Sequence, residues 1–382
     1  MIGITYGKHT ISKADIDAVV AVLKSDYLTQ GPKVKEFEEK YAEYIGSKYA
    51  VAVANGTAAL HLSALALGVK KGTKVITSPL TFVATANAVL YCGGEIDFCD
   101  IDPVTLLLDI DLVRKKLAAS PKGTYSGIIP VDFTGYPIQM DAFRDLADEY
   151  GLWILEDACH APGGYFFDSA NDKQNCGNGN YADLAIFSFH PVKHIACGEG
   201  GMITTNSKDL YEKLLLLRSH GITKDPNKIK SNQGDWYYEM QALGFNYRLS
   251  DISSSLGISQ LSRSEANLNK RKSIAKKYDQ VFSSIDWIET PDTSEGHAYH
   301  LYIIKVKERK ALYDFLRKEN IFVQIHYIPV HLQPYYKKLG WEIGDFPIVE
   351  NYYEQCLSIP IYPSLKNEEQ KYVISQILKF YA

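Results

Sequence analysis

Hydrophobic positions in the first two-thirds of the chain follow two alternating patterns. Short apolar runs with the length of buried strands lie at residues 49–53, 74–78, 94–102, 127–133, 152–158, 181–189 and 201–205. Between them, apolar residues recur every three or four positions, as in helices that cover a core, at residues 12–25, 55–68, 82–94, 111–120 and 140–151. The first of these helices opens with a capping-box pattern, Ser12 to Asp15. This order predicts an α/β fold with a mostly parallel central sheet covered by helices on both faces.

The pattern changes after about Arg248. A long, mostly helical stretch is followed by a strand pattern, a helix, a second strand pattern and a last helix, at residues 248–284, 297–306, 308–320, 321–329 and 367–381. We therefore predict two domains, a large one with the N-terminal segment over residues 1–250 and a small C-terminal α/β domain over 251–382. The polar, Asn- and Gly-rich stretch at 168–183 predicts a surface loop.

Composition narrows the class of protein. The 382 residues are 46% hydrophobic and 23% charged, which is ordinary for a globular protein with a sizeable core. A formal charge of −4 and the lack of a basic block argue against nucleic acid as a partner. The sequence has no apolar run of membrane-spanning length and no signal-peptide pattern, so we expect a cytoplasmic protein without membrane contact. The six cysteines form no CxxC pair, which disfavours zinc ribbons and disulfide frameworks.

The first candidate for chemistry is the start of the helix that follows residues 49–53. Gly56, Thr57 and Ala58 open this helix, and the free backbone N–H groups at a helix start can bind an anion. The alternative is that Asn55 or Thr57 only caps the helix. The stretch contains neither the P-loop pattern nor GxGxxG, so it matches neither of the common nucleotide-binding motifs.

The second candidate is an acidic pair at the end of a buried strand. Glu156 and Asp157 end the apolar run LWILED, where ligands of open α/β sheets gather. A buried acid there needs a cation or hydrogen-bond donors, and a protonated ring nitrogen or an arginine would serve. A structural ion pair or helix cap is the alternative. His160, three residues on, is placed to lie beside the same ligand or to be structural.

The third candidate is Lys193 in the stretch FSFHPVKHIACGEGG, residues 187–201. Ser188 precedes it by five residues at the end of a strand pattern. A surface lysine is the usual case, but apolar and Gly-rich flanks favour a desolvated amine with a lowered pKa, which can act as a nucleophile. His190 and His194 have i, i+4 spacing, but Pro191 interrupts a helix there, so we predict no metal site.

These candidates together match the needs of one cofactor. A helix-start anion site, a strand-end aspartate, a serine and a lysine in a Gly-rich turn are what pyridoxal 5′-phosphate (PLP) requires. In this interpretation Gly56, Thr57 and Ser188 hold the phosphate, Asp157 keeps the ring nitrogen protonated, and Lys193 forms the Schiff base.

The order of several motifs extends this interpretation to a family. The chain resembles the PLP-dependent sugar-nucleotide aminotransferases of the DegT/StrS group over nearly its whole length, through YLTQGPKVKEFEE, VANGTAALHL, TFVATANAV, VDFTGYP, LEDACHAPGG, FSFHPVKHIACGEGGMITTN, RSHGI, GFNYRLSDISSSLGISQL and HYIPVHLQPYY. The resemblance implies a fold-type-I PLP-dependent transferase, similar in fold to aspartate aminotransferase. Ala196 and Cys197 replace an expected Thr-rich pair, and the loop between Gly164 and Tyr181 looks long.

The resemblance also implies roles for single residues. Lys193 matches the catalytic Schiff-base lysine, and the matching cofactor-binding positions are Gly56, Thr57, Ala58, Phe82, Asp157, His160, Ser188 and Asn246. Asn246 corresponds to a residue that reaches the cofactor from the other subunit, which implies a homodimer with shared active sites. Substrate contacts are implied for Thr29, with Gln30 beside it, and for His326 and Tyr327.

The implied reaction moves an amino group from L-glutamate to C4 of a UDP-linked 4-keto-6-deoxy-N-acetylhexosamine, with pyridoxamine phosphate as the intermediate form of the cofactor. The product is the UDP-linked 4-amino-4,6-dideoxy sugar that leads to pseudaminic acid. The alternative is another 4-keto or 3-keto sugar linked to UDP, dTDP or GDP. A related dehydratase would carry histidine in place of Lys193, and a non-catalytic relative would not be expected to keep Asp157, Ser188 and Lys193 together.

Overall fold

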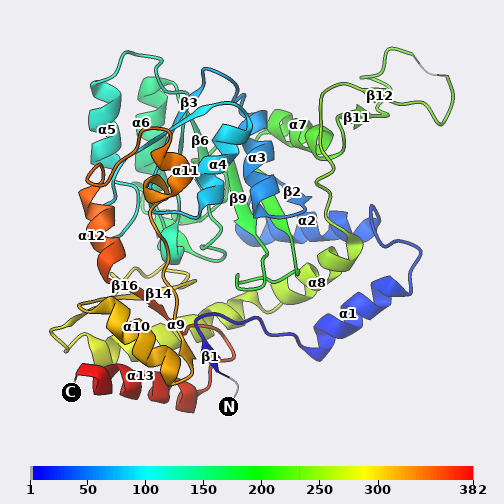
Figure 1. The fold of residues 1–382 in the computed structure, drawn as a ribbon. Coiled ribbons are helices and arrows are strands. Elements are labelled where there is room, and N and C mark those ends of the chain that lie inside the picture. Colours follow the sequence, from blue (N-terminus) through cyan, green and yellow to red (C-terminus); the bar gives the residue numbers. More distant parts are fainter. Residues whose placement is uncertain (1–2, 232, 382) are drawn as a thin grey trace.

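A seven-stranded sheet forms the centre of the molecule. The computed structural model describes residues 3–231 and 233–381 (Figure 1). The strands of this sheet, in spatial order, are β2 (Tyr49–Val53), β10 (Gly201–Thr205), β9 (Leu184–Ser188), β6 (Trp153–Asp157), β5 (Gly127–Ile129), β3 (Lys74–Thr77) and β4 (Glu95–Phe98). All run parallel except β10, which is antiparallel to β2 and β9. The predicted mostly parallel α/β sheet is confirmed.

Helices pack on this sheet at the positions where the sequence predicts them. They are α3 (Gly56–Ala66), α4 (Val83–Tyr91), α5 (Ile110–Ala118) and α6 (Met140–Tyr150). Helix α7 (Lys208–Arg218), which follows β10, was not predicted. Strand residues such as Val51, Ile76 and Ile154 are completely buried in the largest apolar core. Helix α2 (Pro32–Ile45) was not predicted, because its charged residues outnumber its apolar ones. Its buried Phe37, Tyr41 and Ile45 stand four residues apart, a helical spacing that could have revealed it.

A smaller sheet lies at the other end of the molecule. It is antiparallel and contains β13 (Ile288–Glu289), β14 (Tyr302–Val306) and β16 (Cys356–Ile359). Helices α9 (Ser264–Phe282), α10 (Arg309–Lys318) and α13 (Asn367–Tyr381) lie around it, and they share an apolar core of their own with its strands.

The N-terminal segment joins this smaller unit. Strand β1 (Ile4–Thr5) pairs in parallel with β15 (Ile321–Phe322), so β1 lies at the same end of the molecule as the last helix, α13 (Figure 1). Conversely, three residues from the C-terminal part of the chain pack in the core of the large sheet, namely Val330, Val349 and Cys356. The two units therefore exchange segments, and the predicted division at residue 250 stays a prediction.

The strand predicted over 321–329 is wrong beyond its first two residues. Only Ile321–Phe322 form β15, and the chain then leaves the sheet edge. The backbone of Gln324 makes a bridge with Ser358, after which His326 and Tyr327 turn toward the large unit. The apolar residues beyond β15 therefore do not mark a strand, and Ile328 among them is 46% exposed.

The surface loop predicted over 168–183 is wrong in part. Strands β7 (Tyr165–Phe167) and β8 (Lys173–Asn175) form a hairpin, and Cys176 behind it is buried. Asp168 accepts hydrogen bonds from the Gln174 side chain (2.7 Å) and the Tyr181 hydroxyl (2.7 Å). Because these polar groups satisfy one another, a polar sequence can lie against the core here.

The remaining elements extend the two units. They are α8 (Asp251–Leu261), α11 (Pro334–Lys337), α12 (Pro347–Gln355), the short strands β11 (Ile222–Thr223) and β12 (Glu239–Met240), and two 3₁₀ turns, Phe133–Gly135 and Val330–Leu332. Strands β11 and β12 lie in an arm that projects from the large unit (Figure 1). Among the described residues, no helix is long and apolar enough to cross a membrane.

Helix α1 (Lys13–Leu23) is held to α8 by a buried carboxylate. The predicted capping box is confirmed, since Asp15 accepts from the Ser12 N–H (2.7 Å) and the Ser12 side chain accepts from the Asp15 N–H (3.2 Å). Asp15 also accepts from the Ser259 hydroxyl (2.6 Å), the Gln260 amide and Arg263. One carboxylate therefore caps α1 and satisfies three side chains at the end of α8.

Replacing Asp15 with alanine should lower the free energy of unfolding by about 3 kcal/mol, because the Arg263 charge loses its buried partner. Urea denaturation followed by circular dichroism measures this loss. The matched control is Asp17→Ala, which removes the exposed ion pair with Lys13 and should cost within about 0.5 kcal/mol. Equal losses in both variants would show that Asp15 does not hold the two helices together.

Candidate active site

One cavity of about 700 Å³ opens at the carboxyl ends of β2, β6 and β9. Ligands of open α/β sheets bind at this edge. The cavity brings together ten of the residues singled out in the sequence, namely Gly56, Thr57, Ala58, Phe82, Asp157, His160, Ser188, Lys193, His326 and Tyr327. These residues come from both units of the molecule, so the site exists only when the units are packed together.

Thr29 and Asn246 lie outside this set. Both are exposed, and each lies in a backbone bridge, Thr29 with Ser250 and Asn246 with Ser219. Gln30, beside Thr29, is exposed as well and has a positive φ of 57°. Their predicted roles at the site would therefore require a second subunit to bring them to it, and these roles stay predictions.

The start of α3 forms one end of the cavity. Asn55 is the helix cap, and its side chain accepts from the Ala58 N–H at 2.8 Å, so the capping alternative holds for Asn55. In the described part of the chain, the N–H groups of Gly56 and Thr57 have no protein acceptor. A β-carbon on Gly56 would come within 2.9 Å of Ser188 Cβ, which shows how closely the helix start and Ser188 approach. Donors of this kind suit an anion.

Asp157 ends β6 at the opposite wall of the cavity. Its Oδ2 accepts from the Thr85 hydroxyl at 2.7 Å, and its Oδ1 accepts from the Cys159 N–H at 3.2 Å. The Thr85 hydroxyl is in turn 2.8 Å from that of Thr81, which lies just before α4. These hydrogen bonds fix the orientation of the carboxylate. Neither threonine was singled out in the sequence, although the hydroxyl of Thr85 within an apolar helix pattern was a usable signal.

Lys193 lies in the turn that follows β9. The turn is closed by a hydrogen bond from the Lys193 N–H to the His190 carbonyl at 2.8 Å. Burial lowers the pKa of the Lys193 amine, although Cys159 and Asp157 nearby act in the opposite direction. A lowered pKa increases the share of neutral amine at neutral pH, and the neutral amine is the nucleophilic form.

Neutral histidines surround this amine. The His160 ring lies 4.3 Å from that of His300 and its Nε2 lies 3.4 Å from the Tyr327 hydroxyl. Burial, and next the charge of Lys193, hold the pKa of His160 well below its usual value, so the ring stays uncharged. Among the described residues, no group pairs with His160 Nδ1, which is buried.

The segment from the small unit closes the cavity on a third side. His326 is buried with its Nδ1 2.7 Å from the Ser358 hydroxyl, and its ring lies 4.9 Å from that of Tyr6. The Tyr327 ring lies 6.0 Å from Phe82, which is largely exposed at the start of α4. Tyr6 was not singled out in the sequence. Only its position after β1, where the N-terminal segment meets the small unit, brings it to the cavity.

The two histidines that flank Lys193 lie in different environments. His190 is exposed and lines the cavity, whereas His194 is buried with its ring 5.8 Å from that of His300.

Ala196 and Cys197, which replace the Thr-rich pair expected from the resemblance, are buried in the turn that carries Lys193. A β-carbon on Gly257 of α8 would come within 2.8 Å of Cys197 Sγ, so glycine there makes room for the cysteine.

The class of protein follows from this arrangement. The fold and the cavity with its lysine, strand-end aspartate and helix-start anion site are those of a fold-type-I PLP-dependent transferase. Residues 9–378 match the model of the DegT/DnrJ/EryC1/StrS aminotransferase family, and the chain belongs to this family.

Similar proteins include enzymes that act on sugar nucleotides. The chain is 40% identical to the UDP-4-amino-4,6-dideoxy-N-acetyl-beta-L-altrosamine transaminase of Campylobacter jejuni strain 81-176, covering 97% of this chain and 95% of that protein. It superposes on PseC of Helicobacter pylori, an aminotransferase of pseudaminic acid biosynthesis, with a TM-score of 0.88 and 29% identity, over 99% and 98% of the two chains. Spr1654 of Streptococcus pneumoniae in its PLP form gives a TM-score of 0.87 and 28% identity, over 98% and 97%.

Replacing Thr85 with valine should lower the free energy of unfolding by about 1–3 kcal/mol, because a buried carboxylate oxygen of Asp157 loses its donor. Thr85→Ser is the matched control, since it keeps the hydroxyl and should lose much less. Thermal or urea denaturation measures both. A valine variant as stable as the serine variant would mean that this hydrogen bond does not hold Asp157.

Proposed function

We propose that this protein is a cytoplasmic, PLP-dependent aminotransferase that moves an amino group from L-glutamate to C4 of a UDP-linked 4-keto-6-deoxy-N-acetylhexosamine. The product would be UDP-4-amino-4,6-dideoxy-β-L-AltNAc, for pseudaminic acid synthesis. The observation that carries the proposal is the cavity in which Lys193, Asp157 and the start of α3 face one space. The 40% identity to the Campylobacter transaminase over nearly the whole chain supports the choice of sugar.

The residues present fit PLP. Gly56 and Thr57 offer N–H groups without protein acceptors to a phosphate, with the Ser188 hydroxyl beside them. The Asp157 carboxylate faces the cavity and suits a protonated ring nitrogen, and the unpartnered His160 Nδ1 offers a further polar contact. When bound, PLP supplies an aldehyde that condenses with amines and a ring that accepts electrons from the reacting carbon.

The chain itself supplies proton transfer and positioning. The Lys193 amine is neutral more often because burial lowers its pKa, so it would take the proton from the reacting carbon of glutamate, hold it at Nζ and release it again within the cavity. In the second half-reaction it moves the proton in the reverse direction. Asp157, held by Thr85 and the Cys159 N–H, keeps a negative charge aimed into the cavity, which stabilises positive charge on a bound ring.

The walls of the cavity orient the substrates and limit access of water. The Phe82 ring at the start of α4 is placed to stack on a planar group, and Tyr327 faces it from the small unit. Burial lowers the pKa of His326 to about 3, so this ring stays neutral and can exchange hydrogen bonds without adding charge. We assign substrate contacts to His326 and Tyr327 from this segment and to Thr29 from a second subunit.

An assay with L-glutamate and a panel of keto sugar nucleotides tests the reaction. The UDP-linked 4-keto-6-deoxy-N-acetylhexosamine should be aminated at C4, with release of 2-oxoglutarate, and mass spectrometry with NMR identifies the product. The UDP-linked C5 epimer is the matched control and should react more slowly. Reaction of only a dTDP- or GDP-linked sugar, or amination at C3, would contradict the proposed substrate and leave the aminotransferase class standing.

We also propose that the protein is a homodimer with shared active sites. Helix α1 and the segment after it expose Ile16, Leu23 and Tyr27, and the arm that carries β11 and β12 exposes Trp236 and Leu243, the last at 79%. Exposed apolar side chains gathered in this way are typical of protein interfaces. Thr29 and Asn246 lie on these two segments, so an interface formed by them would bring both residues to the partner's cavity.

Mixing two inactive variants tests the shared sites. Lys193→Ala removes the catalytic amine and Asn246→Asp places a negative charge where the cofactor phosphate of the partner would lie, so each homodimer should show little activity. After unfolding and refolding together, mixed dimers contain one site with both native residues, and activity should return to about one quarter of the native value. The control is Lys193→Ala mixed with itself. No recovery from dimers shown to be mixed would contradict shared sites.

A further inference from the structure

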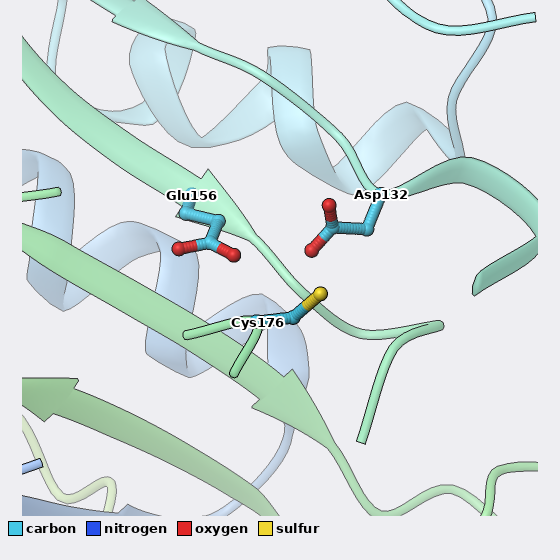
Figure 2. Close-up of side chains that lie close together, drawn as sticks. All are labelled: Asp132, Glu156 and Cys176. Carbon is cyan, nitrogen blue, oxygen red and sulfur yellow. The ribbon is translucent and has the colours of Figure 1, made fainter. Parts of the chain in front are cut away.

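Two buried carboxyl groups outside the cavity have no charged partner. Asp132 follows β5 and is completely buried, and Glu156 on β6 is 3% exposed. Figure 2 shows the two carboxyl groups facing each other, with the Cys176 thiol beside them. In the described part of the chain, neither carboxyl forms a salt bridge. Two adjacent negative charges in such a place would be strongly unfavourable.

The hydrogen bonds of the pair leave a completely buried oxygen of Asp132 without a donor. Asp132 Oδ1 accepts from the Ile138 N–H at 3.0 Å, and Glu156 Oε1 accepts from the Gly177 N–H at 2.8 Å. Asp132 Oδ2 is buried, and among the described residues no N–H or O–H donates to it. A hydrogen bond between the two carboxyl groups would satisfy this oxygen only if one of them carries a proton.

We propose that Asp132 and Glu156 share one proton at neutral pH and act together as positioning residues for Asp157. The pair ties the turn after β5 and the loop after β8 to the end of β6, directly before Asp157. The Asp132 N–H also donates to the Asp157 carbonyl at 3.1 Å. With one shared proton, the Asp132–Glu156 pair carries a single negative charge next to Asp157 in place of two. Only the role given to Asp157 rests on the proposed function.

The surroundings of the pair support this protonation. Burial raises the pKa of Asp132 well above its usual value, and the charge of Glu156 adds to the effect. Burial likewise raises the pKa of Glu156. The titratable groups that interact electrostatically with the pair are Asp157 and Cys159, from β6 and the residues after it, and Cys176 from the loop after β8. None of these carries a positive charge that could replace the proton.

A metal ion is the competing occupant, because Asp132, Glu156 and Cys176 each offer one ligand atom and these atoms lie within 4.8 Å of one another. The proton is favoured for two reasons. Burial raises the pKa of the Cys176 thiol well above its usual value, whereas a metal needs the thiolate. One oxygen of each carboxyl is already used by a backbone N–H.

Infrared spectroscopy of the purified holoenzyme tests the shared proton directly. The wild type near neutral pH should show the carbonyl stretch of a protonated carboxyl group, shifted by exchange into D₂O. The band should vanish in Asp132→Asn and in Glu156→Gln, whose amide N–H replaces the proton. It should persist in Asp97→Asn, the matched control, because Asp97 is a buried carboxylate paired with Lys74 and Lys116. A wild type without the band, or variants that keep it, would overturn the proposal.

The pH dependence of stability gives a second measurement. A carboxyl whose pKa is raised in the folded protein stabilises it at low pH, and this stability is lost as pH rises toward the folded pKa. Between about pH 5 and pH 8 the folding constant of the wild type should fall relative to that of Asp132→Asn, with a slope approaching tenfold per pH unit. Equal slopes would overturn the proposal. If Asp132→Asn does not fold, Glu156→Gln provides the comparison.

The positioning role and the metal alternative have their own readouts. Glu156→Ala should lose bound PLP during gel filtration, whereas Glu156→Gln should retain it, because the amide keeps the tie to Gly177 and Asp132. Retention of PLP by both variants would contradict the positioning role.

One equivalent of tightly bound metal in the purified protein would show that an ion, and not a proton, joins the carboxyl groups. None of these measurements requires turnover, so failure of the proposed aminotransferase reaction is seen separately.

Discussion

The structure around the cavity depends on keeping carboxyl groups at the end of one buried strand. Asp157 faces the cavity, and Glu156 directly before it points to the other side of the sheet, where Asp132 lies. Each of these carboxyl groups needs hydrogen-bond donors, a positive charge or a proton, because the end of the sheet is shielded from water. Asp157 accepts hydrogen bonds from Thr85 and the Cys159 N–H. Glu156 and Asp132 each accept one from a backbone N–H, and in our proposal they share one proton. The loops that meet at β6 are arranged to provide these donors.

A second constraint is that the cavity is built from segments far apart in the chain. Tyr6 follows β1, which pairs with β15, and this pairing brings Tyr6 beside His326. Asp100, after β4, accepts hydrogen bonds from the N–H groups of Ile348 and Val349 at the start of α12. The small unit is thus fastened to the large sheet after the segment that carries His326 and Tyr327. Movement between the units would change the third wall of the cavity and leave Lys193 and Asp157 in place.

Much of the fold could be predicted because its signals are local. Buried parallel strands such as 49–53 are apolar throughout, and the helices between them repeat apolar residues at helical spacing. Some predictions failed in segments that are rich in charged or polar residues. Helix α2 is rich in charge, and the hairpin at 165–175 satisfies its polar groups internally. Residues 321–329 failed for the opposite reason, since they are rich in apolar residues but only Ile321–Phe322 form a strand.

The sequence by itself determined most strands and helices around the central sheet, the helix start at Gly56, the positions of Asp157 and Ser188 at strand ends, and that of Lys193 in a turn after a strand. These features follow from spacing along the chain, and parallel strands bring their ends to one edge. Only the tertiary structure decided the antiparallel direction of β10, the presence of Tyr6 and Thr85 at the cavity, and the pairing of Asp132 with Glu156. Hydrogen bonds and charge compensation between residues distant in the chain produce no periodic pattern in the sequence, because any element that reaches the site can supply the partner.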